Sequence, residues 1–142
     1  MKEKSRCFID SNVWLYLLDR DIENAKYKIA KEIVRENTVI LSVQVVNEVG
    51  NNLRSPKKPF HYTEDELMEV IHYFFSSYFT FVDMAKEVYL KASELRKRYG
   101  FGYYDGIIVA AAFVGNADIL YSEDLHNGLV IEKKLKIINP FE

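Results

Sequence analysis

Short apolar runs alternate with longer amphipathic segments along almost the whole chain, and this alternation limits what the chain can fold into. Five runs have the length and residue types of strands: residues 6–10, 38–42, 78–82, 118–121 and 136–138. Helical spacing fills residues 12–18, 22–36, 43–53, 63–75, 84–99 and 104–114. Strands separated by helices favour a parallel sheet with right-handed crossovers and helices on both faces. The sequence therefore predicts a three-layer α/β/α fold around a central parallel sheet of about five strands.

Polar residues at the starts of the predicted helices indicate where several of them begin. Ser42 is placed to cap the helix that follows the second strand, and Ser11 or Asn12 can cap the first helix. Thr63, with a glutamate three residues later, matches a capping box. Asp83 is expected to cap the long helix that follows it.

The composition is that of a folded globular protein. The chain has 142 residues, 49% of them hydrophobic, and no repeat or linker, so residues 1–142 are expected to form a single domain. The net charge of -2 means that any contact with nucleic acid depends on local patches. The one cysteine, Cys7, is expected to be a packing residue. Without a signal peptide, a membrane span or a disulfide, we expect a cytoplasmic protein that does not enter a membrane.

Four acidic residues lie where a predicted strand leads into a helix or loop, or in the first turns of a helix: Asp10, Glu48, Asp105 and Asp124. Because the carboxyl ends of parallel strands lie along one edge of a sheet, we expect these carboxylates to converge there. Carboxylates held close together repel one another, and the usual remedy is a hard divalent cation bound through oxygen. Such a cation activates water and stabilises charge on a phosphate during transfer. The pattern therefore indicates a Mg²⁺ or Mn²⁺ site, with all four acids as metal ligands and catalytic residues.

Each acidic residue also has an ordinary structural interpretation. Asp10 can cap the helix that follows it, and Asp105 in a first helical turn interacts favourably with the helix dipole. Glu48 can be a solvated helix residue, and Asp124 can be a turn residue before Gly128. Each signal is weak alone, and it is their joint occurrence at one predicted edge that favours a site.

Two polar residues are expected to support the acidic set. The amide of Asn12 can orient a carboxylate or a water, and Ser122 is placed to hydrogen-bond a carboxylate or a metal-bound water. Glu123 is a weaker alternative to Asp124 as a ligand, because adjacent side chains diverge.

Taken together, these segments resemble the motifs of PIN domains, and most closely those of VapC-type toxin ribonucleases. FIDSNVWLY resembles the opening motif, in which an Asp is followed two residues later by an Asn. SVQVVNEV resembles the second motif, YYDGIIVAAA the third and LYSEDLHNG the fourth. The resemblance covers nearly the whole chain, and the motifs are specific only in combination.

The resemblance implies a fold, an activity and partners. It implies a PIN fold with about five parallel strands and a Mg²⁺- or Mn²⁺-dependent endoribonuclease, in which the four acids bind metal and Asn12 and Ser122 support them. It also implies a homodimer and, for VapC toxins, a cognate antitoxin that inserts into the active site. PIN domains also occur in ribosomal RNA processing and DNA flap cleavage, but a short chain with no appended domain favours the toxin.

Three further residues are candidates for contact with an RNA substrate: Arg54, Arg98 and His126. Arg98 ends a basic run next to aromatic residues and Asp105, although a cation there also complements the helix dipole. His126 follows Asp124 by two residues. Arg54 belongs to a second basic stretch.

Two other functions fit parts of the pattern. A catalytically inactive PIN fold would act as an RNA- or protein-binding module, and the presence of all four acids argues against it. A phosphatase-like enzyme would use Asp10 as a nucleophile. Such enzymes require an Asp at the second position after the nucleophile, where this chain has Asn12.

Overall fold

The computed structural model describes residues 4–142, which form six strands and six helices. The strands are β1 (Arg6–Ile9), β2 (Thr38–Leu41), β3 (Thr80–Phe81), β4 (Ile119–Tyr121), β5 (Val130–Ile131) and β6 (Leu135–Ile138). The helices are α1 (Ser11–Leu17), α2 (Ala25–Glu36), α3 (Val43–Arg54), α4 (Glu64–Phe74), α5 (Lys86–Tyr99) and α6 (Tyr103–Val114). A pair of helices separates each of the first three strands from the next, as the sequence predicts.

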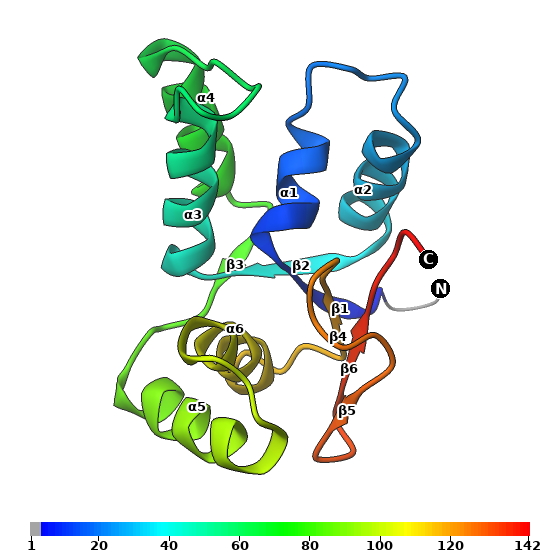
Figure 1. Cartoon of the computed structure of the whole chain (residues 1–142), viewed down its shortest axis with the longest axis vertical. Coiled ribbons are helices and arrows are strands. Elements are labelled where there is room, and N and C mark those ends of the chain that lie inside the picture. Colours follow the sequence, from blue (N-terminus) through cyan, green and yellow to red (C-terminus); the bar gives the residue numbers. More distant parts are fainter. Residues whose placement is uncertain (1–3) are drawn as a thin grey trace.

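The strands form one sheet in the order β3-β2-β1-β4-β6-β5. All neighbouring pairs from β3 to β6 are parallel, which confirms the predicted parallel sheet. In Figure 1, helices α1 to α4 lie on one side of this sheet and α5 and α6 lie on the other, so the three layers are also confirmed. The strand order reverses beside β1, since β2 is on one side of it and β4 on the other. Ligands bind outside the carboxyl ends of the strands at such a reversal.

The two outer strands differ from the prediction. β5 pairs antiparallel with β6 across a turn in which Glu132 and Lys133 have φ values of 47° and 59°. The sequence does not predict this strand, because two residues are too few to show an alternating pattern. The strand expected over residues 78–82 contains only Thr80–Phe81, which pair with β2 at the opposite edge.

The predicted caps of α3 and α4 are confirmed. Ser42 accepts a hydrogen bond from the backbone N–H of Val45 at the start of α3. Thr63 and Glu66 form both bonds of a capping box at the start of α4. These bonds satisfy N–H groups that the first helical turn leaves without partners.

Three other helices begin differently from the prediction. The cap of α1 is Asp10, not Ser11 or Asn12. Asn24 caps α2, which therefore begins three residues later than expected. The prediction that Asp83 caps α5 is wrong, because the helix begins only after Ala85, which makes no capping bond through its side chain.

Helix α6 is the most buried helix, and its position fixes one part of the candidate site. Every residue from Gly106 to Ala112 is buried. It packs so closely on α5 that a Cβ on Gly106 would lie 2.7 Å from Cγ of Arg96. Its first turn carries Asp105. Among the described residues, no helix is both long enough and apolar enough to cross a membrane.

Trp14 of α1 packs against aromatic residues of α4 and of the segment that precedes β3. Its ring is 1% exposed and meets Phe74, Phe79 and Tyr73 edge-on, with centroids 5.0, 5.6 and 6.5 Å away. Its Nε1 has no hydrogen-bond partner among residues 4–142. Cys7 is buried in the same core, as expected of a packing residue, and burial raises the pKa of its thiol to about 12.

We expect replacement of Trp14 by Ala to lower the free energy of unfolding by about 3–5 kcal/mol, because it leaves a large cavity. Trp14→Phe should cost less than half as much, because it keeps most of the ring and removes a buried N–H that has no partner. Urea denaturation of both variants measures the difference. Equal losses would mean that the indole N–H is satisfied.

Candidate functional site

The four predicted acids come from four different elements that meet at the carboxyl edge of the sheet. Asp10 follows β1 and begins α1, while Glu48 lies in the second turn of α3, which follows β2. Asp105 lies in the first turn of α6 and Asp124 in the loop after β4. The charges of Glu48 and Asp105 both act on Asp10, and those of Asp124 and Glu48 act on Asp105. The structure therefore brings all four carboxylates into one electrostatic cluster.

Asp10 is the buried member of the cluster, with 8% of its surface exposed. Its Oδ2 accepts a hydrogen bond from the Ser122 hydroxyl at 2.8 Å, and its Oδ1 accepts one from the Ser11 N–H at 2.8 Å. Burial raises the pKa of Asp10 to about 6, the two hydrogen bonds oppose this rise, and the charges of Glu48 and Asp105 add to it. The helix-capping role and the place in the cluster are therefore compatible.

Ser122 and Asn12 connect Asp10 to the loop that carries Asp124. Ser122 is completely buried, and its oxygen accepts hydrogen bonds from the N–H groups of Asp124 and Leu125, both at 3.3 Å. The Asn12 amide donates to Oδ2 of Asp124 at 3.0 Å and accepts from the N–H of Glu123 at 3.2 Å. Both residues thus orient acidic side chains, in the positions that the sequence predicts for them.

Glu48 is held by two residues whose roles the sequence analysis missed. The Ser11 hydroxyl donates to its Oε2 and the Gln44 amide donates to its Oε1, both at 2.8 Å. Gln44 precedes Glu48 by one helical turn, so the spacing of four residues was a usable signal. Ser11 lies within the first motif but could be taken only for a helix cap. Glu48 is half-buried, as its apolar helix neighbours indicate.

Asp105 and Glu123 have opposite environments. Asp105 is exposed, and its carboxylate has no hydrogen bond or ion pair to another side chain among residues 4–142. Partial burial raises the pKa of Asp105, and the charges of Asp124 and Glu48 raise it further. Glu123 instead forms an ion pair with Lys26 at 2.5 Å and accepts a hydrogen bond from the Tyr16 hydroxyl at 2.8 Å. The Glu123 carboxylate is therefore bound by Tyr16 of α1 and Lys26 of α2.

The cluster has the donor chemistry of a divalent-metal site. Its carboxylates are hard oxygen ligands, and in the part of the chain that the structure describes none of them pairs with a lysine or arginine. Their hydrogen-bond partners are neutral, so the repulsion among them is not offset by a side-chain cation. Within residues 4–142, however, no three acidic, histidine or cysteine side chains already stand as a ready-made ligand set.

Among residues 4–142, none of the three predicted RNA-contact residues has a side-chain hydrogen bond or ion pair to a carboxylate of this cluster. Arg54 lies six residues beyond Glu48 on α3 and pairs with Glu64 at 2.7 Å. Arg98 lies 3.8 Å from Glu132 at the turn between β5 and β6. His126 is exposed in the loop after β4. Both arginine side chains are partly exposed in these ion pairs, and contact of the three residues with RNA stays a prediction.

A sequence comparison identifies the family that carries this arrangement. The sequence model of the PIN domain family matches residues 7–126, which are most of the chain and include all four acids. The chain belongs to the PIN domain family. Among curated protein sequences, none matches it.

Solved structures show that the PIN fold of this chain is that of VapC-type toxins and toxin–antitoxin complexes. A toxin–antitoxin complex from Klebsiella pneumoniae aligns with a TM-score of 0.69 at 16% identity, covering 96% of this chain and 98% of that one. VapC20 from Mycobacterium tuberculosis, a toxin that cleaves the sarcin–ricin loop, aligns with a TM-score of 0.62 at 15% identity, covering 80% of this chain and 86% of that one. VapBC2 from Rickettsia felis, bound to promoter DNA, aligns with a TM-score of 0.59 at 18% identity, covering 84% of this chain and 88% of that one.

We expect Asp10→Asn to stabilise the PIN domain at pH 7.5 in the absence of divalent metal. The folded state binds the Asp10 proton more tightly than the unfolded state does, since its pKa is about 6 when folded and roughly 3.9 when unfolded. The free energy of unfolding therefore falls as the pH rises through this window. Asn has no carboxyl group to ionise, so the free energy of unfolding of Asp10→Asn should not fall in this way and should exceed that of the wild type by about 1–3 kcal/mol at pH 7.5.

Urea denaturation in EDTA at pH 7.5 and pH 4.5 measures this effect. The advantage of Asp10→Asn should shrink at pH 4.5, where the wild-type carboxyl is also protonated. Asp83→Asn, an exposed aspartate outside the cluster, is the matched control and should change little. A variant less stable than wild type at pH 7.5 would show that the hydrogen bonds of Asp10 outweigh its desolvation.

Proposed function

We propose that this protein is a Mg²⁺- or Mn²⁺-dependent endoribonuclease, the toxin of a VapBC-type toxin–antitoxin pair, that works in the cytoplasm. The observation that carries the proposal is the cluster of four carboxylates, which has no side-chain cation among residues 4–142 to offset its charge. Membership of the PIN family supports a nuclease. The fold shared with a toxin that cleaves the sarcin–ricin loop supports RNA as the substrate.

Each residue of the cluster has a role in this proposal. Asp10, Glu48, Asp105 and Asp124 hold the metal, which supplies an activated water and stabilises negative charge on the scissile phosphate. Ser122 fixes Asp10 and the start of the Asp124 loop, and Asn12 fixes Asp124 itself. Ser11 and Gln44 fix the two oxygens of Glu48. Such supporting partners commonly contribute about 10–100-fold to metal affinity or activity.

Among residues 4–142, no three possible ligand side chains stand together as a ready-made metal site, so the proposed site requires side chains able to rotate towards the ion. Asp105 is the ligand best able to move, because it is exposed and its carboxylate makes no hydrogen bond among the described residues. Asp10 is the fixed ligand, since it is buried and holds two hydrogen bonds. Asp10 would therefore be the most firmly positioned ligand of a bound metal, and Asp105 would be the ligand freest to rotate towards it.

The test is cleavage of a mixed RNA pool in Mg²⁺ or Mn²⁺. We expect cleavage by the wild type, none in EDTA, and a loss with Asp10→Asn and Asp105→Asn that exceeds the roughly 10–100-fold effect of removing a supporting residue. Ser122→Ala should fall within that range, and Asp83→Asn should cleave normally. Cleavage by Asp105→Asn at the wild-type rate would show that the carboxylate cluster is not the active site.

Thermal unfolding separates this enzyme from the alternative, an inactive PIN fold that binds RNA or protein. A metal that binds only the native state raises the melting temperature. We expect saturating Mn²⁺ to raise it for the wild type and for Asp83→Asn but much less for Asp105→Asn. An unchanged melting temperature, together with no RNA cleavage, would favour the binding module.

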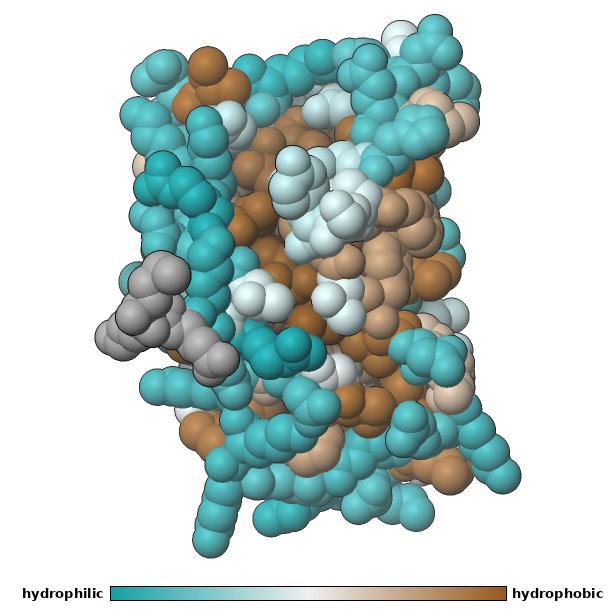
Figure 2. All heavy atoms as spheres, turned by 180° about the vertical axis from the view of Figure 1, so that it is seen from behind, coloured by the Kyte–Doolittle hydropathy of each residue, from teal (hydrophilic) through white to brown (hydrophobic). Residues whose placement is uncertain are grey.

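We also propose that the protein is a homodimer that uses the β3 edge. Val43, Phe75, Tyr78, Tyr89 and Leu90 are 46–79% exposed, and they come from α3, the end of α4, the approach to β3 and α5. In Figure 1 these elements follow one side of the molecule. Figure 2, which shows the rear face, also has apolar side chains gathered between hydrophilic margins. Exposed apolar patches of this kind often mark subunit interfaces.

Light scattering tests the dimer. The wild type should have twice the 16.6 kDa mass of one chain, and Leu90→Lys should shift it towards the monomer. Ile22→Lys is the matched control, because Ile22 is 58% exposed but lies outside the β3 edge. A monomeric wild type at micromolar concentration would contradict the proposed interface.

The second partner is an antitoxin protein that covers the active site. Two of the structural neighbours are toxin–antitoxin complexes. Next to Glu48, a hollow of about 610 Å³ is lined by Met84, Tyr89, Tyr103 and Tyr104, which offers an apolar surface beside the acidic cluster. Repeating the RNA cleavage assay with the product of an adjacent gene tests this proposal through loss of cleavage.

A further inference from the structure

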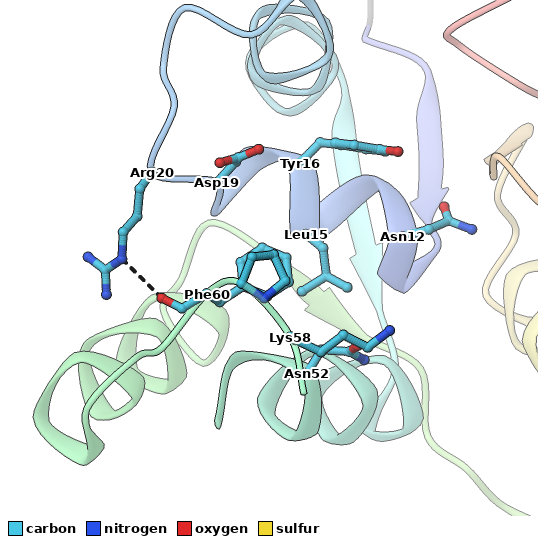
Figure 3. Close-up of a pocket in the computed structure, with 9 residues that line it drawn as sticks. Asn12, Leu15, Tyr16, Asp19, Arg20, Asn52, Lys58 and Phe60 are labelled. Atoms are coloured by element: carbon cyan, nitrogen blue, oxygen red, sulfur yellow. Dashed lines mark hydrogen bonds between the residues drawn. The ribbon is translucent and has the colours of Figure 1, made fainter. Parts of the chain in front are cut away.

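A second cavity, of about 360 Å³, includes Asn12, a neighbour of the acidic cluster, in its lining. It lies between α1, the end of α3 and the loop that precedes α4 (Figure 3). Asn12 is one of its lining residues and also donates the 3.0 Å hydrogen bond to Asp124. Asn12 therefore links the lining of this cavity to one carboxylate of the cluster, so a molecule bound beside Asn12 would lie near the proposed reaction centre.

The loop that forms the outer wall of the cavity is held in place by specific bonds. Nε of Arg20 donates to the carbonyl of Phe60 at 3.0 Å, which is the bond drawn in Figure 3. The Tyr62 hydroxyl donates to the carbonyl of Leu18 at 2.7 Å, and Arg54 donates to the carbonyl of Tyr62 at 2.7 Å. The cavity is therefore formed before any ligand arrives, which lowers the entropy cost of binding.

The lining combines apolar surfaces with a few polar groups. Leu15, Pro59 and Phe60 supply apolar walls, and Asn12 and Asn52 supply amides near the acidic end. The Asn52 amide donates to the carbonyl of Glu48 at 2.8 Å, which leaves its own side-chain oxygen available as an acceptor. Apolar walls with a small number of oriented polar groups are typical of small-molecule sites, and the volume lies in their usual range.

Lys58 is the available positive charge at this cavity, whose lining also includes the carboxylate of Asp19. Its ammonium has no hydrogen bond or ion pair within residues 4–142, whereas Arg20 is bound to the loop carbonyl and to Glu66. Figure 3 shows the Lys58 side chain extending towards the end of the cavity where Asn12 lies. A positive charge at this point attracts an anionic group close to the carboxylates.

We propose that this cavity holds one unpaired nucleobase of the RNA, next to the scissile phosphodiester, and that Lys58 contacts a phosphate beside that base. The inference rests on the proposed ribonuclease function. An unstacked base requires apolar or aromatic surfaces for its faces and hydrogen-bonding groups for its edge, and Phe60, Leu15 and Asn52 supply both. The site therefore selects the nucleotide at one position flanking the cleaved bond.

An abasic scan tests the pocket. Short single-stranded RNAs that contain the cleaved sequence carry an abasic nucleotide at each flanking position in turn. For the wild type, one position should lower kcat/KM by about tenfold or more, in line with the free energy that stacking contributes for one base. For Phe60→Ala and Asn52→Ala, kcat/KM with the intact RNA should fall by most of this tenfold factor. An abasic nucleotide at this position should then cause no further loss of kcat/KM.

Lys58→Ala should raise KM with little change in kcat, and Lys57→Ala is the matched control, because Lys57 is exposed in the same loop but does not line the cavity. Fluorescence anisotropy with an uncleavable RNA in EDTA gives a second readout that does not require activity. Melting temperatures of all variants show whether Phe60→Ala unfolds the loop, and Asn52→Ala keeps the test valid if it does.

Three outcomes would overturn the inference in distinguishable ways. No cleavage of any RNA by the wild type would overturn the proposed function and the pocket with it. Normal cleavage with equal abasic penalties in wild type, Phe60→Ala and Asn52→Ala would overturn the pocket alone. Unchanged RNA cleavage in these variants, together with loss of inhibition by a protein partner, would assign the cavity to that partner.

Discussion

The hydrogen bond from Ser122 to Asp10 joins the ends of the two strands between which the sheet reverses its order. It spans 112 residues of sequence and lies where almost no water reaches. Because the same serine oxygen also accepts two backbone N–H groups of the following loop, the bond sets the position of Asp124 as well as that of Asp10. The positions of Asp10 and of the loop that carries Asp124 thus depend on one buried hydroxyl.

The cluster concentrates negative charge in a place that folding alone would not favour. Burial raises the pKa of Asp10, and like charges raise it further, so the folded chain at neutral pH bears an electrostatic cost. Neutral hydrogen-bond donors hold the carboxylates in place without cancelling their charge. An arrangement of this kind is stabilised by a cation from outside the chain, which is why the fold and the proposed chemistry depend on the same residues.

Two cavities, one lined in part by Glu48 and the other in part by Asn12, differ in character. The one beside Glu48 is lined by exposed tyrosines and adjoins the apolar β3 edge, which suits protein partners. The one beside Asn12 has a fixed loop wall and an available lysine, which suits a nucleotide. The two cavities therefore differ in the kind of partner that we propose for each.

The sequence by itself determined the fold class, the parallel sheet and the caps at Ser42 and Thr63. It also predicted that the four acids, with Asn12 and Ser122, lie at one edge of the sheet, while their role in binding metal stays a prediction. These features follow from periodicity and from residues at element boundaries, which are local properties of the chain. Only the tertiary structure decided what depends on contacts between distant segments. Ser11 of α1 donates a hydrogen bond to Glu48 of α3, and Glu123 forms an ion pair with Lys26. Arg54 forms an ion pair with Glu64 and donates a hydrogen bond to the carbonyl of Tyr62. No periodic pattern encodes such pairings, because they arise only after packing has chosen which side chains meet.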